Sequence, residues 1–110
     1  MKAPVKIGDL RHRVQIESPV RAGDGGGGAS VTWTLVAEVW AAIWPRGSDE
    51  VFDLDRVAGR ASHDIWIRKR DGVKPEMRVR FGTRVFDILG VIDVEDRGRY
   101  LRCPAEERDL

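Results

Sequence analysis

The sequence is poor in the residues that build covalent and metal frameworks. Its 110 residues include one cysteine and two histidines. A single cysteine, Cys103, excludes an internal disulfide and a cysteine-based zinc site, and it fits synthesis in a reducing cytoplasm. No run approaches the roughly 18 apolar residues of a membrane-spanning helix, and the N-terminal residues lack the apolar core of a signal peptide. We therefore expect no membrane association, no secretion by that route, no metal and no cofactor.

An excess of charge of one sign is also lacking. The chain has 19 basic and 18 acidic residues, a formal net charge of +1, which argues against a protein dominated by nucleic-acid binding. With 42% hydrophobic and 34% charged residues, the composition is globular rather than disordered or collagen-like. The length is too short for two independent cores, so residues 1–110 are expected to form a single domain.

Apolar residues recur mostly with a period of two, which is typical of half-buried strands. Strands are predicted over residues 12–18, 31–44, 62–70, 79–81, 84–94 and 99–103, and Pro19 is predicted to end the first. In the long second strand one alternating set is predicted to face the core: Val31, Trp33, Leu35, Ala37, Val39, Ala41 and Ile43. The pattern indicates a mainly β fold, a small antiparallel β-barrel or sandwich of about six strands.

Two segments depart from this alternation. Residues 21–30 are rich in glycine and predict a flexible loop that binds a partner, with four consecutive glycines, Gly25, Gly26, Gly27 and Gly28, at its centre. Residues 46–61 show helical spacing with Ser48 as a candidate N-cap, so one short helix is predicted after the long strand. This insertion carries four acidic residues close together: Asp49, Glu50, Asp53 and Asp55.

No pattern of catalytic residues stands out. His12 and His63 are not tied by spacing to a serine or cysteine nucleophile, so a catalytic triad is unsupported. The glycine run lacks the Lys-Ser/Thr pair and the following helix of a phosphate-binding loop. The aspartates are scattered without metal-ligand spacing. We therefore predict that the protein is not an enzyme.

Basic residues gather between residues 68 and 84, where seven of them outweigh two acidic ones. One interpretation is a subunit interface, in which Arg68, Arg70, Arg78 and Arg80 meet the acidic insertion of a neighbouring copy. A second is a small β-barrel that binds nucleic-acid backbone through this basic hairpin. A merely solvated hairpin is the third. High salt separates a nucleic-acid-binding barrel from a ring held by an apolar seam, since it releases the barrel from DNA but leaves the ring largely intact.

The tryptophans carry more information. Trp40, Trp44 and Trp66 fall on strand faces that otherwise carry threonine and charged residues, so at least one of them is expected to be exposed or covered by a partner. We therefore place all three among the candidate interface residues. The alternative is that the predicted helix covers them.

Nearly the whole chain resembles the phage head–tail joining family, the small adaptor and head-completion (stopper) proteins. The resemblance is carried by GDLRHRVQIESP (8–19), VTWTLVAEVWAAIWP (31–45) and, most diagnostically, DGVKPEMRVRFGTRVFDILGV (71–91). These are turn and packing residues, so they point to a fold family more firmly than to a function. Similar proteins occur in gene transfer agents.

The resemblance implies a structural virion protein of the neck, assembled in the bacterial cytoplasm. It would form a ring, with a hexamer favoured and a dodecamer as the alternative, that closes the DNA channel after packaging and allows tail attachment. The implied partners are a portal or adaptor protein on the head side, a tail terminator or other tail protein on the tail side, and DNA passing without sequence specificity. In the family the insertion after the long strand is linked to channel closure, which makes Asp49, Glu50, Asp53 and Asp55 candidate channel or gating residues.

Overall fold

The fold is mainly β, with seven antiparallel strands in one sheet. This computed structural model describes residues 7–23, 29–46, 61–94 and 99–108. A short 3-10 helix, η1 (Ile7–Asp9), precedes the strands. The strands are β1 (His12–Gly23), β2 (Ala29–Pro45), β3 (His63–Arg68), β4 (Arg78–Phe81), β5 (Arg84–Ile88), β6 (Ile92–Asp93) and β7 (Tyr100–Glu107).

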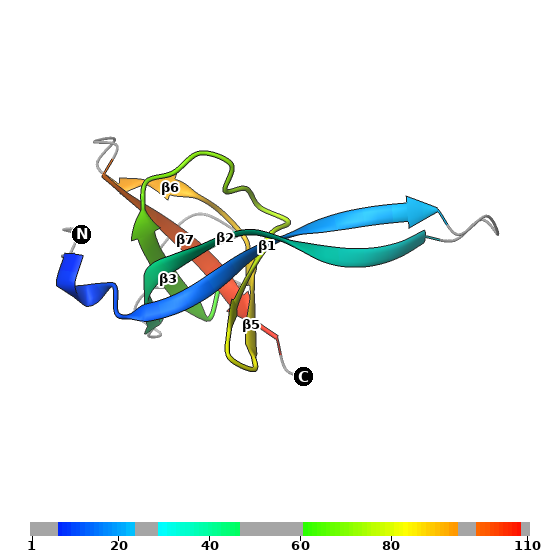
Figure 1. The fold of residues 1–110 in the computed structure, drawn as a ribbon. Helices are drawn as coiled ribbons and strands as arrows, with labels where there is room; N and C mark the ends of the chain where they lie inside the picture. The colour runs from blue at the N-terminus through cyan, green and yellow to red at the C-terminus, as the bar shows by residue number, and fades with distance from the viewer. Residues whose placement is uncertain (1–6, 24–28, 47–60, 95–98, 109–110) are drawn as a thin grey trace.

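The sheet closes on itself. Its order is β3-β2-β1-β4-β5-β7-β6, and β3 also pairs with β7 along residues His63–Arg68. The circuit β3-β2-β1-β4-β5-β7 therefore has no free edge around the core, as the predicted barrel requires. It is not a regular barrel, because β1 and β2 continue well beyond it as a two-stranded arm (Figure 1). The molecule accordingly measures 50 × 27 × 27 Å along its principal axes.

The core fills the closed part of the sheet. Val14 and Ile16 of β1, Ile65 and Ile67 of β3 and Phe86 of β5 are all at most 2% exposed. A second, smaller cluster on the outside joins Leu10, Ala42 and Trp66, with Trp44 and Tyr100 against it. Leu10, which follows η1, thus packs against Ala42 and Trp66 and covers this part of the sheet.

The predicted helix at 46–61 lies almost wholly outside the described residues, and the described part of the chain contains no α-helix. Pro19 does not end the first strand, which continues to Gly23. At Pro19, β1 pairs with Trp33 of β2 on one side and with no described strand on the other, so the missing N–H leaves no ladder bond unmade there.

Two further strand predictions need correction. The single strand predicted over 84–94 is two strands, β5 and β6, which pair with the same edge of β7 in registers one residue apart. The last strand runs past Cys103 to Glu107. Pro104 does not stop it, because Pro104 is buried between neighbours and its carbonyl accepts the Leu89 N–H at 2.8 Å.

A β-bulge at Val36 overturns the predicted core face of the long strand. Ile16 pairs with Ala37, but the next residue, Glu17, pairs with Leu35, which leaves Val36 as the extra residue. One extra residue reverses the inward and outward alternation for the rest of the strand. The core face therefore comprises Ala37, Val39, Ala41 and Ile43, whereas Val31, Trp33 and Leu35 lie on the opposite face.

Candidate interaction site

The arm is the main exposed apolar feature of the described structure. Beyond the closed sheet it consists of residues 18–23 of β1 paired with residues 29–34 of β2. Val20, Val31, Leu35 and Val36 are between 38% and 58% exposed. One face carries Pro19, Val31, Trp33 and Leu35 together with the charged Arg21, and the other is mostly hydroxylated, with Ser18, Ser30, Thr32 and Thr34 beside Val20 and Ala22. Such an amphipathic ribbon is typical of a surface that another protein covers.

A cluster of three side chains fixes the base of the arm. Arg78 of β4 donates through Nε to Glu17 Oε1 at 2.7 Å, and its guanidinium lies 4.1 Å from the centre of the Trp33 ring. The side chains of Arg78 and Glu17 are only 15% and 13% exposed. The ion pair and the stacking together tie the base of the arm to the closed sheet.

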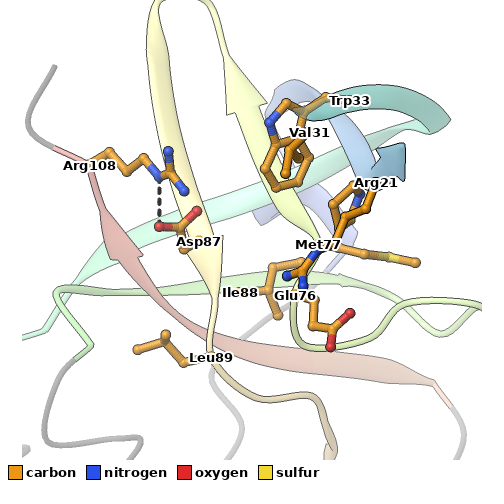
Figure 2. A pocket seen from close by; sticks show the side chains of 10 residues that line it. Arg21, Val31, Trp33, Glu76, Met77, Asp87, Ile88, Leu89 and Arg108 are labelled. Atoms are coloured by element: carbon orange, nitrogen blue, oxygen red, sulfur yellow. Dashed lines mark hydrogen bonds and ion pairs between the residues drawn. The ribbon is translucent and has the colours of Figure 1, made fainter. Parts of the chain in front are cut away.

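A groove of about 470 Å³ lies where the arm meets the sheet. Figure 2 shows Arg21, Val31 and Trp33 of the arm on one side, with Met77 and Ile88 toward its floor. Its remaining walls are Pro19, Glu76, Asp87, Leu89 and Arg108. Arg108 donates to Asp87 at 2.8 Å, so this charged wall is internally paired. The apolar floor of the groove, formed by Met77 and Ile88, suits an apolar side chain of a partner protein.

The predicted tryptophans take different positions. Trp40 is 51% exposed and Arg13 lies 5.5 Å from its ring centre. Trp44 is half-buried, and its ring centre is 5.9 Å from that of Trp66. Trp66 is 2% exposed, so its assignment to an exposed face was wrong: Leu10, Ala42 and Trp44 cover it. The expectation that at least one of the three is exposed is met by Trp40.

The basic residues are mostly paired rather than gathered into one surface. Arg78 and Arg80 both face Glu17, at 2.7 and 4.0 Å. Lys69 contacts Asp93 at 2.8 Å and Arg84 contacts Glu107 at 2.8 Å. Arg68 and Arg70 lie elsewhere, beside Val39 and Trp40 in a groove of about 250 Å³. The structure therefore separates the four candidate arginines into two pairs, one at the base of the arm and one beside Trp40.

Several predicted residues cannot be placed. Gly25, Gly26, Gly27 and Gly28 lie outside the described residues, as do Asp49, Glu50, Asp53 and Asp55. The surface that sequence reasoning missed is the apolar face of the arm, since it assigned Val31, Trp33 and Leu35 to the core. The adjacent apolar pair Leu35-Val36, which interrupts strict alternation, is the signal that could have revealed the bulge.

A serine, a histidine and a carboxylate do lie together, but in a structural arrangement. Ser62 Oγ lies 2.9 Å from His63 Nδ1 and accepts the backbone N–H of Glu107, also at 2.9 Å. His63 Nε2 lies 3.9 Å from Glu107 Oε1. The hydroxyl therefore joins β3 to β7, and Arg84 already binds the carboxylate.

The one thiol and the possible metal ligands of the described residues show no reactive or metal-binding arrangement. Burial, and secondarily the charge of Asp64, raises the pKa of the Cys103 thiol to about 12, so it is not a nucleophile. Within the described ranges no group of three or more His, Cys, Asp or Glu residues could hold a metal ion. No helix in those ranges is long and apolar enough to cross a membrane.

A small closed β-sheet that projects an exposed amphipathic arm has the features of an assembly protein. The model of the phage head completion protein family matches residues 5–108. The chain therefore belongs to the phage head completion protein family, a family of structural, non-enzymatic proteins. It is a virion component at the head–tail junction of a phage or gene transfer agent particle.

Solved structures that are similar to this chain include the following two. A chain from the "Virion of native gene transfer agent (GTA) particle" is 29% identical, with a TM-score of 0.66, covering 91% of this chain and 96% of that one. The solution structure of protein SF1141 from Shigella flexneri 2a is 26% identical, with a TM-score of 0.70, covering 92% and 96%. No curated protein matches the chain.

Proposed function

We propose that the protein forms a ring in the neck of the particle, between a portal or adaptor protein on the head side and a tail terminator or other tail protein on the tail side. In this position it closes the DNA channel after packaging and provides the surface to which the tail attaches. Six copies are favoured over twelve. The DNA passes through the ring without sequence recognition.

The exposed arm is the observation that carries this proposal. Val31 and Leu35 are 48% and 58% exposed on a two-stranded ribbon that no other described strand supports. A hairpin of this kind is at best marginally stable alone in water. A domain with an apolar projection at one end and unlike surfaces elsewhere makes heterologous contacts, which propagate until rotation closes them into a ring.

The charges favour passage of DNA over tight binding. Phosphate-binding proteins rely on unpaired Lys and Arg side chains. Here Arg78, Arg84 and Lys69 each have a carboxylate within 2.8 Å, which weakens the case for the alternative, a nucleic-acid-binding barrel that uses residues 68–84. That alternative predicts retention on DNA at low salt and release at high salt.

The interface role of Trp40 and of the pair Arg68 and Arg70 stays part of the proposal, because these side chains meet at one exposed groove. Trp44 stays among the proposed interface residues because it is only half-buried. Trp66 is no longer proposed as an interface residue, because it is buried. From the sequence alone, Gly25–Gly28 remain a predicted partner-binding loop. Likewise, Asp49, Glu50, Asp53 and Asp55 remain predicted channel residues, to be tested by Asn or Gln replacement and a DNA-retention assay.

Separate Leu35→Ser and Trp40→Ser variants test the ring proposal in particles. Both side chains are exposed, so the isolated variants should unfold at temperatures close to that of the parent protein. Particles made with them should show incomplete necks, lost DNA and few attached tails. Ile92→Ser is the matched control, since Ile92 is exposed at 37% but lies on β6, away from the arm. Complete, tailed particles from both the Leu35 and the Trp40 variant would remove the basis of the proposal.

A further inference from the structure

Both long edges of the arm are without a neighbouring strand. β1 pairs with β4 only at Gln15–Glu17, and β2 pairs with β3 only at Ala41–Pro45. The outer edge of β1 over 18–23 and that of β2 over 29–40 therefore present unpaired backbone groups to solvent, as far as the described strands go. Unpaired edges are templates for the addition of another strand.

The two edges are unlike. The β1 edge carries Pro19 and Arg21, so an added strand gains no hydrogen bond from the nitrogen of Pro19 but can pair with the backbone of the other residues. The β2 edge from Ala29 to Trp40 has neither proline nor a basic residue and is rich in Val and Thr, which favour strands. Its one charge, Glu38, is bound by Arg13 and Gln15 at 3.0 and 2.8 Å. Nothing in the composition of the β2 edge discourages an added strand.

A second copy of the chain covers these edges better than any single partner does. A strand from a different protein on the β2 edge leaves the β1 edge of every copy open. When the β2 edge of one copy takes the β1 edge of the next, one repeated contact covers both. All arms then point the same way, because adjacent strands stay antiparallel. Two β2 edges pairing with each other would give a closed dimer and no ring.

We propose that the arms of neighbouring copies join edge to edge, with residues 29–34 of β2 in one copy adding to residues 18–23 of β1 in the next. This inference rests on the proposed ring. It unites the faces that carry Pro19, Val31, Trp33 and Leu35, with Arg21 among them, into one continuous and mainly apolar band. The opposite, hydroxylated faces form a second band.

Mixed single-cysteine variants test the pairing directly. One set has Ser18→Cys, Val20→Cys or Ala22→Cys, and the other has Ser30→Cys, Thr32→Cys or Thr34→Cys. All six positions lie on the hydroxylated face of the arm, and opposed residues in antiparallel strands are about 4.5–5.5 Å apart at Cα, within disulfide reach. The native Cys103 is buried, so each variant offers one reactive thiol. Each β1 variant is co-assembled with each β2 variant and oxidised mildly.

Edge-to-edge pairing predicts a disulfide-linked dimer of one β1 variant with one β2 variant in the pairings that match the register. The same mixtures kept unassembled should give none, and neither set alone should give dimers. If complete rings form and no mixed dimer appears in any pairing, the inference is overturned while the ring proposal stands. Cross-linking of the β2 variants to a different virion protein also overturns it. If no ring forms in parent particles, the proposed function itself fails.

Amide hydrogen exchange gives an independent readout in the parent protein. Strand addition hydrogen-bonds the outward amides of residues 29–34 and 18–23, which the isolated chain leaves to solvent. Their exchange should slow at least about tenfold on assembly, at alternate residues of each strand. Assembled rings in which these amides exchange as fast as in the isolated chain would contradict strand pairing.

Discussion

The guanidinium of Arg78 lies over the ring of Trp33, 4.1 Å from its centre, and joins strand β4 of the closed sheet to the base of the arm. Glu17, at 2.7 Å from Arg78, holds that guanidinium in place. The three residues sit on β4, β2 and β1, and Glu17 is also where the bulge alters the register. One stacked ion pair thus links the base of the arm to the closed sheet.

Replacement of Arg78 by lysine should loosen the arm without unfolding the sheet. Lysine keeps the charge near Glu17 but loses the planar group that stacks on Trp33. The expected loss of unfolding free energy is about 1 kcal/mol, with faster amide exchange in residues 18–23. Arg80→Lys is the control, because Arg80 is half exposed and lies 4.0 Å from Glu17. Equal effects of the two replacements would show that stacking on Trp33 is unimportant.

A buried ion pair provides a second test of the fold. Arg46 donates to Asp64 at 3.3 Å, and their side chains are 3% and 9% exposed. Asp64→Ala leaves a buried cation without this carboxylate and should lower the unfolding free energy by about 3–5 kcal/mol. Asp93→Ala, which breaks the more exposed pair with Lys69, should cost less than about 1 kcal/mol. Urea unfolding of both variants measures the difference, and similar losses would refute the argument.

Much of the closed sheet was predictable, because its strands alternate regularly and end at turns such as Gly82-Thr83, where Gly82 has φ of 61°. The arm was not. Alternation assigns a face by counting residues, and the extra residue at Val36 reverses the count without any break in β propensity. Pro19 was predicted to end the first strand, since a sequence does not reveal which edge of a strand is unpaired. The cover of Trp66 by Leu10 is a long-range contact that no local pattern encodes.

Stability should fall as the pH drops through the ordinary pKa of histidine. Burial lowers the pKa of His63, with Arg84 acting in the same direction and Glu107 and Asp64 opposing it. The unfolded chain then binds a proton more readily than the folded one, so stability present above about pH 6.5 is lost below it. Unfolding measured from pH 7.5 to 5.5 should show this slope. In His63→Gln the slope should be reduced, and an unchanged slope in this variant would assign it to other groups.

Deletion of Val36 separates the bulge from its side chain. Without Val36, Ala37 still opposes Ile16 and Leu35 still opposes Glu17, so the strand pairing and the core survive. Val36 is 38% exposed, and its loss should change the unfolding free energy by no more than about 1 kcal/mol. A bulge bends its strand and increases the local twist, so its removal should redirect the arm and prevent assembly. Val36→Ala keeps the extra residue and should assemble normally. A deletion variant that completes necks as well as the parent protein would show that the bulge does not aim the arm.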